Sequence, residues 1–393
     1  MPFPSGDFPF QNMLADLMKL MNQGAMPQWD MARQLATAVA SDGATDPNVD
    51  PLDRIRIEEL GRIAELNVAE VTGLDLTSGG RPLMVRPLTR SEWAVRTLEA
   101  WQPLLEPLSQ PSGELHVGSD TNLPDELSED EPAMKLFETL SRMVRPAMLG
   151  VQLGSSVGHL ARRAMGQYAF PIPRPSADEI SVVPANIEAF ARDWSLPEDD
   201  LKMWVCTSEM AHHAVFRLPH VRSRFEELLS TYVAGYTPAT SGIAQQLAET
   251  DLSDLSKIQE LMGDPTGVMR ESETLEQTTA RERLEAAVAA LEGYVDHVTD
   301  TVGNRVIGSL GQLTEALRRR RVDRDAGERF MEQLFGLELD QAEFDRGSTF
   351  VRGVLDRAGE EGLSKLWSTP GSLPTPAEIS APGLWLERIA IES

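Results

Sequence analysis

The sequence predicts a mainly α-helical protein with a minor, small β element, and three observations lead to this fold class. Apolar residues recur at helical spacing through most of the chain. Only two short stretches, GGRPLMVRP at 79–87 and EISVVP at 179–184, are typical of strands, so we expect any sheet to be small. The 393 residues are 41% hydrophobic and 25% charged, which is enough for a substantial buried core.

Proline- and glycine-rich segments divide this helical pattern. We expect residues 1–28 to form a flexible N-terminal arm with one short amphipathic helix at 13–21, and residues 111–132 to form an acidic surface loop. The remainder divides into a helical N-terminal region, 29–170, and a second region, 171–393, which together make one continuous globular unit. Further helices are expected at 29–40, 51–71, 91–108, 133–166 (one helix or two), 185–193, 196–218, 220–235, 251–262, 272–302, 309–321, 324–336, 341–358 and 359–366.

Three glycines recur at every fourth position inside the segment 133–166. Gly150, Gly154 and Gly158 therefore share one face of a helix, and another backbone can approach that face closely. In a membrane this spacing would indicate helix dimerisation, whereas in this chain we expect tight intramolecular packing.

Four consecutive arginines, 318–321, close one of the expected helices. Cations at a helix C-terminus suit the macrodipole, so the simplest interpretation is a solvated helix end. A docking patch is the alternative.

The charge balance excludes several classes of function. The chain carries 61 acidic and 36 basic residues, for a formal net charge of −25, which argues against nucleic-acid binding and against docking on an anionic membrane. Its single cysteine, Cys206, precludes an intrachain disulfide and fits a reducing compartment. The first residues do not read as a signal peptide, and no stretch is apolar for long enough to span a bilayer. We therefore expect a cytoplasmic protein, whose oligomeric state the sequence does not indicate.

The stretch WVCTSEMAHHAVF, at 204–216, nearly matches a zinc-binding helix motif. Ser195 and Glu198 have the spacing of a capping box, which predicts that a helix starts there. Along this helix Ser208 and His212 lie near the centre of the apolar stripe, and we expect Glu209 at its edge.

A polar pair in the middle of a buried face needs partners, because burying unpaired polar groups costs free energy. Positions i and i+4 of a helix point the same way, as Ser208 and His212 do, and a glutamate directly after the first position can reach a metal-bound water. The alternative is a core histidine that is satisfied by a backbone carbonyl or by Glu209.

A second helix offers a further carboxylate. Glu292 lies at the rim of its apolar seam and is followed at once by Gly293, which suits a third metal ligand on a packed helix. Asp296, one turn later, would orient a ligating histidine. The alternative is a solvated carboxylate edge. The seam residues are Leu284, Val288, Leu291, Val295, Val298 and Val302.

The chain resembles a known family. From about residue 30 onward it is similar to the actinobacterial zincin-like metallopeptidases, which are also labelled hydrolases or coenzyme F420 biosynthesis-associated proteins. The resemblance rests on LKMWVCTSEMAHHAVF at 201–216, LEGYVDHV at 291–298, FDRGSTFVRGV at 344–354 and the closing LPTPAEISAPGLWLERI.

The resemblance implies a zincin-like helical metallopeptidase fold, a zinc cofactor and a peptide or protein substrate. On the family's pattern, Glu209 is the catalytic general base, and His212 and Glu292 are metal ligands. Ser208 departs from the pattern, because it occupies the position of the first histidine. Serine is a poor ligand for zinc, so two protein ligands remain. A weaker alternative ligand is His213.

Asp296 is a weaker candidate as well, and several other groups need the tertiary structure before they can be assigned a role. These are the histidines His159 and His297 as ligands, and Tyr232, Tyr236 and Tyr294 as oxyanion donors.

Three hypotheses of function follow. The first is a zinc-dependent peptidase, in which Glu209 deprotonates a metal-bound water. The second is a zincin-fold protein that has lost metal chemistry and serves as a binding or scaffolding module. The third is a helical interaction protein whose acidic surface and methionine-rich arm recruit a partner. Ser208 separates the first two hypotheses, and deletion of residues 1–28 would test the third.

Overall fold

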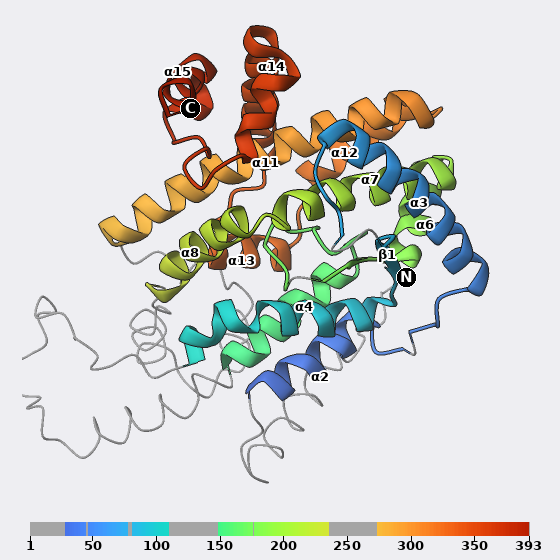
Figure 1. Cartoon of the computed structure of the whole chain (residues 1–393). Coiled ribbons are helices and arrows are strands. Elements are labelled where there is room, and N and C mark those ends of the chain that lie inside the picture. The colour runs from blue at the N-terminus through green and yellow to red at the C-terminus, as the bar shows by residue number, and fades with distance from the viewer. Residues whose placement is uncertain are drawn as a thin grey trace, which may run out of the picture.

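The computed structural model describes residues 28–44, 46–77, 81–109, 148–175, 177–235 and 273–392, and it confirms a mainly helical fold with only two short strands (Figure 1). The expected arm, the acidic loop and the helix at 251–262 lie outside the described residues, apart from residue 28. The elements are α2 (Gln28–Ala40), α3 (Pro51–Thr72), β1 (Met84–Pro87), α4 (Arg90–Leu105), η1 (Glu106–Ser109), a helical segment at 148–161, β2 (Glu179–Val182), α6 (Pro184–Asp193), α7 (Glu198–Phe216), α8 (Pro219–Ala234), α11 (Leu275–Val306), α12 (Leu310–Val322), α13 (Ala326–Phe335), α14 (Gln341–Ser364), η2 (Lys365–Trp367), η3 (Glu378–Ser380) and α15 (Pro382–Glu392).

Helix α7 lies in the middle of the molecule, where α3, α6, α8 and α11 pack around it (Figure 1). Its residues from Val205 to Phe216 are all buried. The expected edge position of Glu209 is therefore wrong: this residue is 5% exposed, and His213 is 4% exposed. Helical periodicity cannot distinguish one buried face from a helix that is covered on every side.

The expected capping box of α7 is also wrong. The helix begins at Glu198 after Pro197, and no side chain caps it. Ser195 instead takes a left-handed conformation with φ 53° in the turn that leaves α6. Three acidic residues in the first turn, from Glu198 to Asp200, suit the positive end of the helix dipole.

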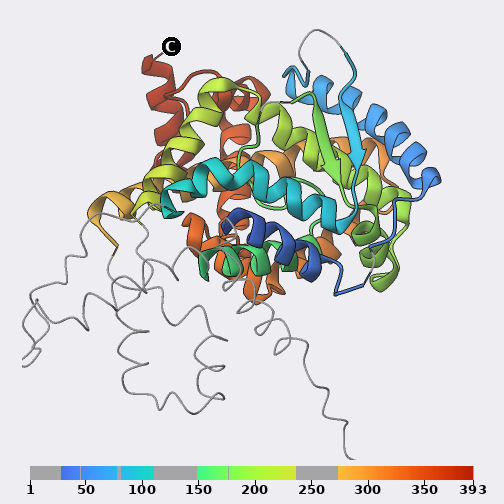
Figure 2. The same cartoon turned by 90° about the horizontal axis from the view of Figure 1, so that it is seen from below.

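Strands β1 and β2 pair in parallel, with Met84 opposite Glu179 and Pro87 opposite Val182 (Figure 2). The first strand is shorter than the expected 79–87. The segment 165–168 adds to this sheet, because the N–H of Val183 donates to the carbonyl of Met165 at 2.8 Å. Figure 2 shows the pair of strands beside α3. The segment 165–168 forms a bridge to this sheet between Gly166 and Val182, and it also contacts α7, because the N–H of Tyr168 donates to Glu209.

Helices α11 and α14 cross at very short range. A Cβ atom on Gly293 would lie 2.3 Å from the carbonyl oxygen of Gly347, and one on Gly347 would lie 1.9 Å from the carbonyl oxygen of Ala289. Gly293 is therefore needed at a helix crossing, rather than to leave room around Glu292.

The tight intramolecular packing expected for the glycine face is confirmed. A Cβ atom on Gly150 would lie 2.7 Å from the carbonyl oxygen of Gln28, and one on Gly154 would lie 2.6 Å from that of Ala32. Gly158 meets the same helix, α2. The glycines thus let the segment 148–161 lie directly against the backbone of α2.

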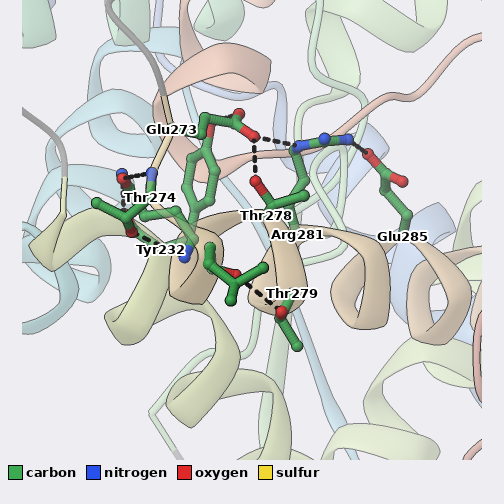
Figure 3. A network of polar contacts seen from close by, with 9 residues as sticks. Tyr232, Glu273, Thr274, Thr278, Thr279, Arg281 and Glu285 are labelled. Atoms are coloured by element: carbon green, nitrogen blue, oxygen red, sulfur yellow. Dashed lines mark hydrogen bonds and ion pairs between the residues drawn. The ribbon is translucent and has the colours of Figure 1, made fainter.

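The end of α8 and the start of α11 are joined by a polar network (Figure 3). Glu273 accepts hydrogen bonds from the hydroxyl of Tyr232 at 3.3 Å and from Nε of Arg281 at 3.1 Å. Thr274 and Gln277 form a capping box, which fixes the first turn of α11.

The helix α15 was not predicted, because its surroundings are rich in proline. Pro382 occupies the first turn, where a missing N–H costs nothing. Trp385 is fully buried, and its indole N–H donates to the carbonyl of Ser372 at 2.7 Å. None of the described helices is long and apolar enough to cross a membrane.

Candidate active site

The polar residues at the middle of α7 line a cleft of about 200 Å³. Ser208, Glu209 and His212 line one side, Glu292 of α11 lines another, and the segment 164–171 closes a third. Arginines from α12 and its neighbours complete the lining, which also includes Leu160, Arg163, Trp204, Val205, Val295, Asp296, Leu317, Arg320, Arg321, Arg324, Glu328, Glu332, Leu339 and Phe344.

His212 and Glu292 are in direct contact. Nε2 of His212 lies 3.0 Å from Oε1 of Glu292, and Nδ1 lies 2.9 Å from the carbonyl oxygen of Ser208. Both partners are acceptors, and only the doubly protonated imidazolium has a donor on each nitrogen. The ring also stacks on Tyr168, with the ring centroids 5.5 Å apart.

The charge state of His212 follows from its neighbours. Burial lowers the pKa of the imidazole, but the carboxylates of Glu292 and Glu209 more than offset burial, and the pKa lies above its ordinary value. His212 and Glu292 thus form a buried ion pair in which a proton lies between the nitrogen and the carboxylate.

Glu209 is held against the backbone of the segment 165–168. The N–H of Tyr168 donates to Oε2 at 3.0 Å. A Cβ atom on Gly166 would lie 2.2 Å from Oε1, so only glycine leaves room for the carboxyl group there. Burial raises the pKa of Glu209 to about 7.

Two further side chains fix that segment from the other side. The indole N–H of Trp93 donates to the carbonyl oxygen of Gly166 at 2.9 Å, and Arg174 donates to that of Gln167 at 2.8 Å. The guanidinium of Arg174 lies 5.2 Å from the ring centroid of Trp101. Burial lowers the pKa of Arg174 to about 10. These bonds preorganise the position of Glu209.

The structure does not give two of the weaker candidates their expected roles. Asp296 does not orient His212, because it forms an ion pair with Arg321 at 2.8 Å. His213 is not one of the residues that line the cleft, and its Nδ1 lies 3.4 Å from the hydroxyl of Tyr168.

The remaining candidates lie elsewhere or have other partners. His297 pairs with Glu360 at 3.1 Å, and His159 is exposed. Tyr232 bonds to Glu273, as described above, and Tyr294 packs edge-on against Trp367. Tyr236 lies outside the described residues. The site tyrosine is Tyr168, which the spacing of the sequence did not single out.

The run of four arginines has two faces. Arg318 and Arg319 are 60% and 63% exposed and pair with Glu315, as expected of a solvated helix end. Arg320 and Arg321 turn inward and line the cleft, which corrects that expectation.

A sequence profile of the zincin-like metallopeptidases matches residues 28–386. The chain belongs to the zincin-like metallopeptidase family. A search of curated proteins gave no match. Among solved structures, one from Chloroflexus aurantiacus, described as a novel fold with a provisional assignment as a hydrolase, aligns with a TM-score of 0.64 and 23% identity over 93% of this chain and 99% of that chain. At this identity the likeness shows a shared fold.

In this zincin-like protein the donors do not fit a zinc ion that is held by three protein ligands. His212 and Glu292 are suitable donors, but the third position is the hydroxyl of Ser208, and Glu209 is bonded to Tyr168. Across the described ranges, no group of three or more His, Cys, Asp or Glu side chains is arranged to hold a metal ion.

Proposed function

We propose that this member of the zincin-like family binds a peptide in the cleft beside α7 and does not hydrolyse it by zinc chemistry. The observation that carries the proposal is the donor set: His212 and Glu292, whose Nε2 and Oε1 lie 3.0 Å apart, are the only two residues of the expected ligand set with strong zinc donors. Ser208, the third member of the motif, adds no strong donor.

A peptide is the ligand best supported by the family and by the lining of the cleft. The Glu209–Tyr168 contact, the Ser208 hydroxyl and the arginines offer polar partners, and Phe344 and Leu339 offer apolar ones. The acidic charge of the chain, −25, disfavours nucleic acid as the ligand.

The second candidate is a zinc-dependent peptidase, and one observation favours it. The pKa of Glu209, raised to about 7 by burial, suits a general base that works near neutral pH. The rigid support from Gly166 and Tyr168 would likewise suit a catalytic group.

Zinc binding by the wild-type protein and by Ser208→His distinguishes the two candidates. We expect the untagged wild-type protein, purified without chelator and dialysed against zinc, to retain no stoichiometric metal. The variant Ser208→His supplies the missing imidazole at i−4 from His212, and we expect it to bind zinc. Elemental analysis after dialysis measures both, and Ser208→Ala is the control that adds no ligand.

Stoichiometric zinc in the wild-type protein, lost in His212→Ala, would refute the binding-module proposal and favour the peptidase. Failure of Ser208→His to bind zinc would instead show that the site does not have zincin geometry.

We also propose a cytoplasmic location. Support comes from Cys206, which is the single cysteine of the chain and is a free thiol buried in α7. The third hypothesis, recruitment through residues 1–28, falls almost wholly outside the described residues.

A further inference from the structure

The charges that line the cleft are almost all paired. Three arginine–carboxylate pairs and one histidine–carboxylate pair account for most of them. The pairs are Arg163–Glu328 at 3.1 Å, Arg321–Asp296 at 2.8 Å, Arg324–Glu332 at 2.6 Å and His212–Glu292 at 3.0 Å.

Arg320 is the exception among the arginines of the lining. Its guanidinium donates to the carbonyl oxygen of Arg163 and lies 5.2 Å from the ring centroid of Phe190. Within the described part of the chain, no carboxylate lies within salt-bridge distance of it. Burial, together with the charge of Arg163, lowers the pKa of Arg320 to about 10, so the group is still a cation at neutral pH.

A half-buried cation without a carboxylate costs free energy, in proportion to the water it has lost. The cost is unusual in a chain with 61 acidic and 36 basic residues, where a carboxylate partner is readily available. Glu328 is close enough to act on Arg320, but its salt bridge is with Arg163. A guanidinium whose hydrogen-bond partner is a neutral carbonyl oxygen, and not a carboxylate, therefore fits an anion that comes from outside the chain.

We propose that Arg320 binds the C-terminal carboxylate of a peptide that enters the cleft. The inference rests on the proposed function and deepens it, because it names the feature of the peptide that is recognised. A guanidinium presents two parallel N–H groups to a carboxylate, so the contact is specific in direction as well as charge.

The size of the cleft favours a chain end over an internal segment. At about 200 Å³ it is smaller than the ~300–1,000 Å³ of typical ligand pockets. The end of a peptide needs only one opening, whereas a continuous segment must enter and leave. The net charge of −25 also disfavours peptides that are acidic throughout, so a single terminal carboxylate is the better match.

The test compares two mixtures of short random peptides, each acetylated at the N-terminus. One mixture has free C-terminal carboxylates, and the other has C-terminal amides. The full-length chain is incubated with each mixture, bound peptides are separated by rapid gel filtration, and they are quantified by mass spectrometry. Arg320→Gln removes the proposed contact, and Arg318→Gln is the matched control, because it removes an exposed arginine of the same helix.

We expect the wild-type protein to retain about tenfold more of the carboxylate peptides than of the amides, the effect of one charged hydrogen-bonded contact. Arg320→Gln should lose this preference, and Arg318→Gln should keep it. Arg320→Lys keeps the charge without the paired N–H groups and should retain part of the preference. The comparison of the two mixtures on the wild-type protein decides the question even if the Arg320 variants fail to fold.

Equal retention of both mixtures by the wild-type protein would overturn the inference and leave the proposed peptide binding intact. Retention of neither mixture would overturn both. An unchanged preference in a folded Arg320→Gln variant would assign the recognition to another residue. Displacement by inorganic phosphate at the same concentration as the peptides would indicate a site for free anions, which also contradicts a peptide-end site.

Discussion

At the scale of single residues, the burial of Glu209 makes the stability of the protein depend on pH. Its pKa rises from the ordinary 4.5 to about 7 on folding. Between these values the unfolded chain has released the proton and the folded chain still holds it, so the free energy of unfolding falls as the pH rises. A shift of this size corresponds to about 3 kcal/mol, lost between about pH 4.5 and pH 7.

Urea unfolding at a series of pH values across that window measures this effect. Glu209→Gln cannot ionise, so its stability should fall less steeply with pH than that of the wild-type protein. Glu59→Gln is the control, because Glu59 is 57% exposed and should leave the slope unchanged. Parallel pH profiles for the wild-type protein and Glu209→Gln would contradict the prediction.

Which residues form the site was only partly predictable. The motif spacing indicated Glu209, His212 and Glu292, and the structure brings these three to one cleft. The motif spacing could not indicate Gly166 or Arg174. Their roles depend on where the chain passes α7 after the segment 148–161, and no local sequence pattern reports that contact.

At the scale of elements, the crossing of α11 and α14 depends on two glycines. We expect Gly347→Ala to lower the free energy of unfolding by about 3 kcal/mol or more, the upper range for overpacking. The new Cβ would lie 1.9 Å from the carbonyl oxygen of Ala289, and a backbone atom inside a helix cannot move aside without shifting that helix.

Denaturant unfolding of the variant gives this value directly. Gly311→Ala is the matched control, because Gly311 also lies in a helix but has open space around its Cβ position. Alanine has a higher helix propensity than glycine, so this control variant should keep its stability or become slightly more stable. A similar small change in Gly347→Ala would mean that the two helices can separate at little cost.

Helices with long, regular periodicity were predicted well, and their boundaries less so. The expected 196–218 and 272–302 correspond to α7, Glu198–Phe216, and α11, Leu275–Val306. The start of α7 was misplaced because a proline turn replaced the expected side-chain cap. The helix α15 was missed because its stability comes from burial of Trp385, which is a tertiary effect.

At the scale of the whole molecule, the net charge of −25 predicts that salt stabilises the fold. Excess like charge repels itself most strongly in the compact state, and dissolved ions screen that repulsion. The midpoint of thermal unfolding should rise as sodium chloride is added from about 0.01 M to about 0.15 M, over which the screening length falls from roughly 30 Å to roughly 8 Å.

Differential scanning calorimetry at neutral pH measures the midpoint, and sucrose at matched osmolality is the uncharged control. A midpoint that falls with salt would show that the attractive ion pairs, such as those around the cleft, outweigh the general repulsion.

The parallel pairing of β1 with β2 also bears on how the protein is made. Met84 of β1 pairs with Glu179, which is synthesised much later. Gly293 of α11 likewise packs against Gly347, which follows it in the chain. During synthesis from the N-terminus, the early helices leave the ribosome long before the segments that bury them. We expect their apolar faces to be exposed throughout that interval, so that the nascent chain needs protection from aggregation until α14 has emerged.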